Sequence, residues 1–224
     1  MKLFVFLAFF ASNVMLSQEC EMFSPFEVGK KLEYTDYNKN GKAQGKSIHE
    51  VIEVKENANP EALIKVKVYD KDKEILNTDY GVKCVDGAFF VDMIRFFDQQ
   101  KLSEQQNFEL QIDGDYLEFP QLMRPDDVLD NGSIQIKVNN EGFTLITLTL
   151  DIINRKVAAI ENLTTSAGTF ECYKITYDYE SKFGILNFKG KGVEWVATGI
   201  GVVKSEDYNK KGKLRSYYEL TSLK

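Results

Sequence analysis

Histidine and cysteine are scarce in this chain, which has one histidine and three cysteines among 224 residues. These four residues are dispersed, so they lack the paired ligand spacing of a closed structural zinc site. A serine or cysteine nucleophile would need His49 as its base, and the local sequence contains no nucleophile elbow. The scarcity argues against zinc and against triad catalysis, and we expect no catalytic residues, no metal and no cofactor.

Proline is also rare, with four residues, whereas aromatic residues make up 12% of the chain. This composition favours a packed fold over a disordered one. After the N-terminal segment, no apolar run approaches the about 20 residues of a membrane-spanning helix, so we expect no transmembrane segment. The glycine pairs Gly190/Gly192 and Gly199/Gly201 have no helix after them, which predicts turns or bulges and not a phosphate-binding loop.

Acidic residues outnumber basic ones, and the formal net charge is −6. The acidic residues are scattered, and a surface of this kind repels phosphate backbones, so nucleic acid is excluded as a partner. Asp126, Asp127 and Asp130 precede Asn131-Gly132, but their spacing differs from the alternating ligands of a calcium loop. We interpret this segment as a turn, with a weak cation site as the alternative.

Residues 1–18 are typical of a secretory signal peptide, with Lys2 followed by an apolar run from Leu3 to Phe10. We expect a soluble mature chain that begins between Ser17 and Cys20, exported to the periplasm or cell envelope. A lipoprotein signal is the alternative, because Cys20 lies close to the cleavage site and lipidation there would anchor the chain. Residues 19–224 are then one β-rich domain.

Alternating apolar and polar residues dominate the remaining sequence and predict strands with one wet and one buried face. Clear examples are LIKVKVYD (63–70), FELQID (108–113), IQIKV (134–138) and LITLTL (145–150). Turn signals separate the runs at Asn40-Gly41, Asp86-Gly87, Asp113-Gly114, Asn131-Gly132, Asn139 to Gly142, Gly190 to Gly192 and Lys211-Gly212. Short connections favour antiparallel neighbours. The predicted fold is mainly β: one large, antiparallel, curled sheet of ten or more strands, a half-barrel or open barrel.

One short helix is predicted over residues 91–106, where Met93, Ile94, Phe97 and Leu102 share a face. The closing strands are predicted in residues 194–220. There Val193, Trp195 and Ala197 share a face, and we expect Trp195 to be largely buried.

Two stretches, KVAAIENLTTSAGTFECYKITYDY (156–179) and EWVATGIGVVKSEDYNKKGKLRSYYEL (194–220), resemble the TapB-like family of exported Bacteroidota proteins of unknown function. The resemblance extends upstream to residues 26–45, 80–93 and 117–134. It implies an exported, half-barrel fold similar to lipoprotein-carrier proteins, and it implies no known reaction. It also places one cysteine at the mature start and one in YGVKC. Because an oxidising compartment favours pairing, we predict a Cys20–Cys84 disulfide that leaves Cys172 unpaired.

Cys172 has three interpretations, which are a packed unpaired thiol, a half-cystine and, least favoured, an enzymatic nucleophile. Lys174 is the only local group that could lower its pKa. His49 is out of phase with Ile48 and Ile52, so we predict that it faces solvent.

We predict that this is a non-catalytic protein that binds an apolar or amphipathic ligand, such as a lipid, in the groove of its curled sheet. The ligand-lining residues that we predict are Tyr173, Ile175, Tyr177, Phe183 and Trp195. The alternative is a cell-envelope protein–protein interaction module, and an uncharacterised hydrolase is the third hypothesis.

Overall fold

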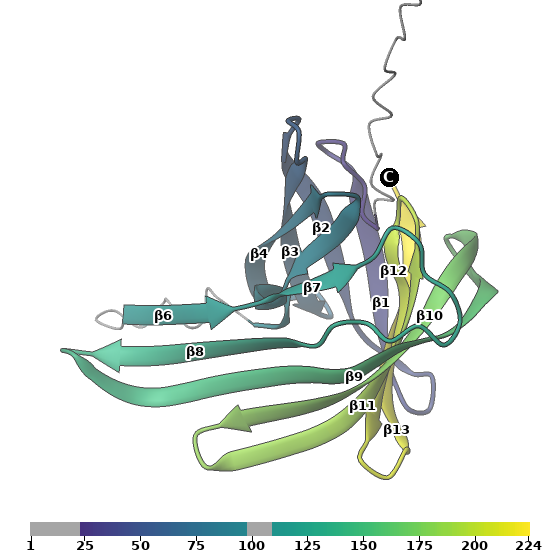
Figure 1. Cartoon of the computed structure of the whole chain (residues 1–224). Helices are drawn as coiled ribbons and strands as arrows, with labels where there is room; N and C mark the ends of the chain where they lie inside the picture. Colours follow the sequence, from purple (N-terminus) through teal and green to yellow (C-terminus); the bar gives the residue numbers. More distant parts are fainter. Residues whose placement is uncertain (1–22, 98–108) are drawn as a thin grey trace, which may run out of the picture.

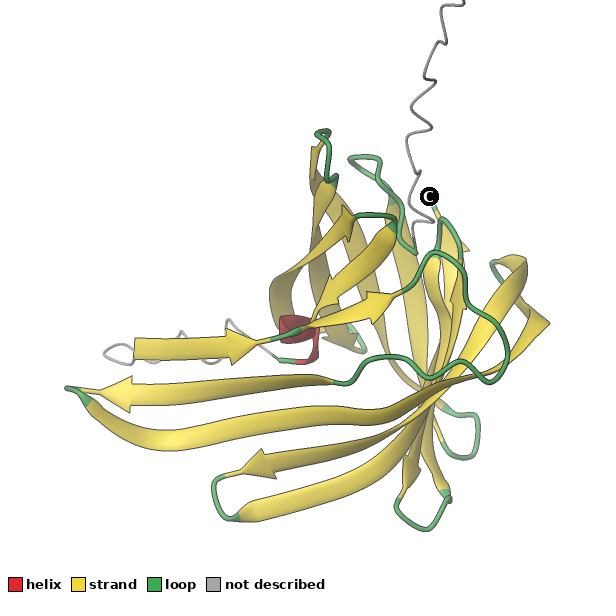
Figure 2. Cartoon of the chain, in the orientation of Figure 1, coloured by secondary structure: helices red, strands yellow, loops and turns green. Residues whose placement is uncertain are grey.

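A single antiparallel sheet of thirteen strands forms the protein (Figures 1 and 2). The computed structural model describes residues 23–97 and 109–224. The elements are β1 (Lys31–Asn38), β2 (Ala43–Lys55), β3 (Glu61–Asp70), β4 (Lys73–Val85), β5 (Ala88–Asp92), the 3-10 helix η1 (Met93–Phe96), β6 (Glu109–Gly114), β7 (Tyr116–Phe119), β8 (Gly132–Asn140), β9 (Phe143–Thr165), β10 (Gly168–Phe183), β11 (Leu186–Ala197), β12 (Gly201–Asn209) and β13 (Leu214–Leu223). The predicted fold class is confirmed.

The sheet curls until its two edges nearly meet. Its strand order is β6-β8-β9-β10-β11-β12-β13-β1-β2-β3-β4-β5-β7. The edge strands β6 and β7 are consecutive in sequence, and Asp115 alone separates them. The Asp115 backbone N–H donates to the Ser133 carbonyl at 2.8 Å, and the Met93 N–H donates to the Asp115 carbonyl at 3.3 Å. One residue therefore connects both edges of the sheet and closes the curl.

Most predicted turns are confirmed, among them Asn40-Gly41, Asp86-Gly87 and Lys211-Gly212, where each glycine has a positive φ. Asp113-Gly114 and Asn131-Gly132 are corrections, because Gly114 ends β6 and Gly132 begins β8. The prediction of a turn at residues 190–192 is also wrong.

Gly190 and Gly192 lie inside β11, opposite Tyr179 and Tyr177 of β10. A Cβ atom at either glycine would overlap the tyrosine ring of the facing strand. Here glycine makes room for an aromatic ring across the strands and does not turn the chain. Gly199 and Gly201, in contrast, have φ values of 73° and 97° and lie at the connection between β11 and β12, as predicted.

The predicted helix at residues 91–106 is much shorter in the structure. Val91 belongs to β5, where it pairs with Val82 of β4 and Leu117 of β7. Asp92 caps the single turn of η1, because its Oδ1 accepts a hydrogen bond from the Ile94 N–H at 2.9 Å. Phe97 is already extended, and residues 98–106 of the prediction, Leu102 included, lie outside the described residues.

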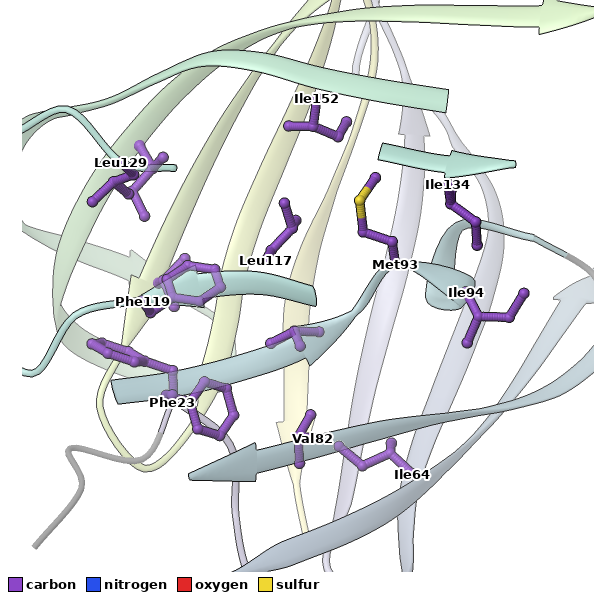
Figure 3. Packing of buried hydrophobic residues seen from close by; sticks show 14 of the residues in the cluster. Phe23, Ile64, Val82, Met93, Ile94, Leu117, Phe119, Leu129, Ile134 and Ile152 are labelled. Atoms are coloured by element: carbon purple, nitrogen blue, oxygen red, sulfur yellow. The ribbon is translucent and has the colours of Figure 1, made fainter. Parts of the chain in front are cut away.

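The main hydrophobic core lies on the inner face of the curl (Figure 3). The alternation in β8 determines which side chains enter it, since Ile134 and Ile136 are 1% and 0% exposed. Phe23 brings the start of the described chain into this core, where its ring lies 5.6 Å from that of Phe119 and 5.7 Å from that of Tyr173. The core therefore joins strands from both halves of the sequence.

A second cluster surrounds Trp195 and includes Cys172, Ala197, Val203 and Leu220. Trp195 is 6% exposed, as predicted. Its indole N–H donates to the Glu161 carboxylate at 2.7 Å, and the Lys174 and Lys204 ammonium groups lie 4.9 and 5.3 Å from its ring centroid. A carboxylate thus accepts from the N–H of a buried indole, and two ammonium groups lie over its ring.

Candidate functional site

A pocket of about 260 Å³ lies on the inner face of the curled sheet. Strands from both halves of the chain form its wall, because the sheet order places β10–β13 next to β1–β4. Half of the lining residues are apolar: Phe23, Leu32, Val66, Val68, Leu76, Val82, Val91, Phe96, Phe119, Val196, Ile200 and Val202, and Gly201 also contributes. The polar lining residues are Ser24, Tyr34, Asp36, Ser47, His49, Tyr80, Arg95, Tyr177, Glu194, Ser205 and Tyr218.

An ion pair between Arg95 of η1 and Glu194 of β11 lies at the polar part of this wall. The Arg95 Nη2 donates to the Glu194 Oε1 at 2.9 Å, and the two side chains are 13% and 6% exposed. Burial opposes the charge of Arg95, but Glu194 and nearby tyrosines raise the pKa of its guanidinium above the ordinary value. Arg95 therefore keeps its positive charge, and the two paired residues are separated by 99 positions in the sequence.

A row of polar side chains continues from this pair across neighbouring strands. Glu194 of β11 pairs with Ser205 of β12, Ser205 pairs with Tyr218 of β13, and Tyr218 pairs with Asp36 of β1. Ser205 hydrogen-bonds the side chains of Tyr177 and Tyr218. The cross-strand register thus places hydroxyl groups beside the ion pair, on the same wall as the apolar lining.

The tyrosines of the pocket keep their hydroxyl protons. Burial raises the pKa of Tyr34 and of Tyr177 well above the ordinary value. Burial also raises the pKa of Tyr80 to about 12, an effect that Arg95 opposes. A neutral hydroxyl both donates and accepts a hydrogen bond, so these groups can bind a polar headgroup.

His49 faces the pocket, which corrects the prediction that it faces solvent. Its ring lies 4.8 Å from that of Tyr34 and 6.1 Å from that of Tyr80. Ser47 and His49 both lie on the inner face of β2, which lines a partly polar pocket. A bulge between Val51 and Glu53 interrupts the alternation of inward and outward side chains along β2. Burial, together with the charge of Arg95, lowers the pKa of His49 to about 3.

This environment predicts that His49 stays neutral in the folded protein from pH 8 down to about 4. An unfolded chain protonates its histidine near pH 6.5, so between pH 6.5 and 3 the unfolded state binds more protons. Protonation of His49 in the unfolded chain therefore lowers the free energy of unfolding as pH falls from 6.5 toward 3, by about 1.4 kcal/mol per pH unit. Above pH 6.5 the histidine is neutral in both states and this loss is absent. Because the chain has one histidine, a single imidazole NMR signal reports its titration. His49→Phe keeps a ring and should flatten this pH dependence, while a folded-state midpoint near 6.5 would contradict the assignment.

The five residues predicted to line the groove are not brought together. Tyr177 lines the pocket, whereas Ile175 is 2% exposed in the main core and Tyr173 packs against that core. Trp195 points to the opposite side from its neighbours in β11, because Glu194 and Val196 line the pocket while the indole lies beside Cys172. Phe183 is 52% exposed at the end of β10. Only Tyr177 of the five is a lining residue in the described part of the chain.

Cys172 is a free and fully buried thiol. Burial raises its pKa to about 11, and Glu161 and Glu171 add to the increase, so the thiolate is disfavoured at neutral pH. Cys84 is disulfide-bonded and 5% exposed. Cys20 lies outside the described residues, so the Cys20–Cys84 pairing stays a prediction.

The segment around Asp126 forms a turn, as predicted. Asp126 has a φ of 78° and its carboxylate pairs with the Lys156 ammonium at 2.7 Å, while the Asp127 Oδ2 accepts from the Arg124 N–H. Within residues 23–97 and 109–224, no three histidine, cysteine or acidic side chains are placed to hold a metal ion.

Arg95 and Glu194 are the site residues that the sequence analysis missed. Each stands in an apolar context, Arg95 in VDMIRFF and Glu194 between Val193 and Trp195. A lone charge in such a run is a signal, since buried charges require a partner. That signal identifies both residues as unusual but does not pair them with each other.

A curled antiparallel sheet defines the structural class of this protein. Residues 27–220 match the DUF3108-like family, and the chain belongs to that family. The TapB-like name is not confirmed by this match. A Bacteroides fragilis protein assigned as exported, with a YmcC-like fold, is 25% identical with a TM-score of 0.76, covering 92% of this chain and 100% of its own. A Parabacteroides distasonis protein assigned as a lipoprotein is 22% identical, with the same TM-score and coverage. No curated protein matches the chain.

The described part of the chain has no helix that is both long enough and apolar enough to cross a membrane.

Proposed function

We propose that this protein is exported and binds an amphipathic ligand, without catalysis, in the pocket of its curled sheet. The observation that carries the proposal is the pocket itself, whose wall combines an extended apolar lining with one buried ion pair and several tyrosine hydroxyls. An apolar wall favours a hydrocarbon chain, and a few well-placed polar groups fix the orientation of its headgroup. Export is supported by the signal-like residues 1–18 and by the two structural relatives assigned as exported or as a lipoprotein.

The curled sheet can enclose a small ligand. Strands β1–β5, β7 and β10–β13 supply lining residues of the pocket, and Asp115 connects the two edges of the sheet. The pocket wall is built from regular strands, whose geometry neighbouring strands hold on both sides. A ligand would therefore meet a largely preformed surface, which reduces the ordering cost of binding.

Filling the pocket should weaken binding. Val68 of β3 lines the pocket, and Val68→Trp would occupy part of its volume with an indole ring. We expect the affinity for a medium-chain fatty acid to fall at least about tenfold, which corresponds to about 1.4 kcal/mol. Isothermal titration calorimetry measures this loss, and mass spectrometry of an organic extract shows whether an amphiphile co-purifies with the wild-type protein.

Lys67→Trp is the matched control. Lys67 is the neighbouring residue in β3, and alternation directs its side chain to the outer face, where it is 40% exposed. This variant adds the same ring to the same strand and should leave the affinity unchanged. Equal loss in both variants, or an extract without any amphiphile together with no binding in calorimetry, would contradict the proposed function.

An envelope interaction module is the second candidate, and exposed apolar side chains favour it. The β8–β9 and β10–β11 hairpins project from one side of the sheet (Figure 1). The Gly184 N–H of one hairpin donates to the Thr147 carbonyl of β9 at 3.2 Å, so the two lie together. Their exposed apolar residues are Phe143, Leu145, Phe183, Ile185, Leu186 and Phe188. This candidate remains if the pocket proves to bind no amphiphile.

A further inference from the structure

We infer that the pocket selects an anionic amphiphile, a single acyl chain with a carboxylate-like headgroup, and that Arg95 binds this headgroup. The inference rests on the proposed function and adds to it the chemical class of the ligand. It follows from the balance of buried charges around the polar part of the pocket and from the donors that surround it.

Two guanidinium groups and one carboxylate lie within electrostatic range of one another, behind and within the pocket wall. Arg95 is paired with Glu194, while Arg155 of β9, 2% exposed, interacts electrostatically with both of them. The Arg155 Nη1 donates to the Asp130 backbone carbonyl at 2.6 Å, and its guanidinium lies 5.0 Å from the ring centroid of Phe119, a lining residue. The group of three therefore carries a net positive charge.

A net charge in surroundings of low polarity is unfavourable unless an opposite charge compensates it. Burial lowers the pKa of Arg155 to about 10, and the positive charge of Arg95 contributes while Glu194 opposes. Asp130 also raises the pKa of Arg155, but its side chain is exposed and its field is screened by water. A ligand anion beside Arg95 would complete the charge balance.

Asp36 is the other acidic residue on the described pocket wall. In the cross-strand row it lies three strands from Glu194, about 14 Å away at the usual spacing of neighbouring strands. Burial raises the pKa of its carboxyl group, and the distance separates its charge from the arginines. Asp36 therefore does not supply the missing charge beside the arginines.

Hydrogen-bond donors stand at the same place. The guanidinium fork has five N–H donors, and within residues 23–97 and 109–224 the side-chain hydrogen bond shown for it, to Glu194 at 2.9 Å, uses one of them. Arg95 can therefore offer further donors to a headgroup while it keeps Glu194 as its partner. Tyr80 and Tyr218 both interact electrostatically with Arg95, and both keep their hydroxyl protons because burial raises their pKa values. Charge-assisted hydrogen bonds from such groups favour a carboxylate over a neutral hydroxyl.

The test compares dodecanoate with dodecanol, which share one chain and differ in headgroup charge. We expect wild-type protein to bind dodecanoate about tenfold more tightly in isothermal titration calorimetry, a difference of about 1.4 kcal/mol. In Glu194→Gln the local positive charge increases, so dodecanoate should bind more tightly still while dodecanol is unaffected. In the double variant Arg95→Gln/Glu194→Gln the preference for dodecanoate should disappear.

Arg215→Gln is the control for loss of an arginine elsewhere, because Arg215 pairs with Asp207 and is 42% exposed. It should keep the full preference for dodecanoate. Circular dichroism establishes that each variant is folded. If the double variant does not fold, Glu194→Gln alone tests the inference, because it must bind dodecanoate more tightly than the wild type does. Equal affinity of the wild type for both ligands overturns the anionic headgroup and leaves the proposed function standing. Absence of binding to either ligand overturns both.

Discussion

Arg95→Met should lower the free energy of unfolding by about 3 to 5 kcal/mol, because it removes the hydrogen-bonded ion-pair partner of the buried Glu194 carboxylate. The Glu194 side chain is 6% exposed, and its Oε1 accepts from the Arg95 guanidinium at 2.9 Å. Methionine keeps an unbranched apolar stem of similar reach, so the loss reports mainly the missing charge. Urea unfolding followed by circular dichroism measures the change.

The double variant Arg95→Met/Glu194→Met should recover most of that loss, because it removes both buried charges together. Replacing a complete buried ion pair with apolar residues is often neutral or stabilising. The four proteins of this double-mutant cycle isolate the coupling between the two residues. A double variant as unstable as Arg95→Met alone would show that packing of the Arg95 stem, and not the ion pair, is responsible.

Trp195→Ala should be the other strongly destabilising change, with a loss of about 3 to 5 kcal/mol, as for other large-to-small core substitutions. The substitution removes the largest side chain of the second cluster and also the hydrogen bond to Glu161. Because Trp195 is the only tryptophan in the chain, its fluorescence follows unfolding directly in the wild type.

Trp195→Phe is the matched control, since it keeps an aromatic ring in the cluster but cannot donate to Glu161. We expect it to cost clearly less than the alanine variant, because most of the packed ring remains and a hydrogen bond to a charged group contributes about 1.5 to 3 kcal/mol. Emission of the folded wild-type protein at the wavelength of solvent-exposed indole would contradict the buried placement of Trp195.

The alternation of apolar and polar residues in the sequence was enough to predict which face of a single strand is buried. Ile134 and Ile136 alternate with polar residues and are buried, because a strand directs successive side chains to opposite faces whatever its partners are. The same reasoning placed Trp195 in a buried cluster. It did not say which side of the sheet that cluster occupies, and so it assigned Trp195 to the pocket wall.

Local pattern was misleading where a residue's role depends on a neighbouring strand. The glycines at 190 and 192 suggested a turn, but they make room for Tyr179 and Tyr177 of the facing strand. The apolar run after Val91 suggested a helix, but pairing with β4 and β7 retains Val91 in a strand. Periodicity alone does not distinguish short apolar runs of either kind, so tertiary pairing decides.

The sequence by itself determined the class of fold, an antiparallel curled sheet, because alternation and close turn signals are local properties of the chain. Only the tertiary structure decided the site. Arg95 and Glu194 lie 99 positions apart and meet because the sheet order brings β11 and η1 to the same interior. His49 changed from a solvent-facing residue to a lining one for the same reason: the inner side of β2 is defined by the strands that curl around it, and no residue of β2 encodes that curl.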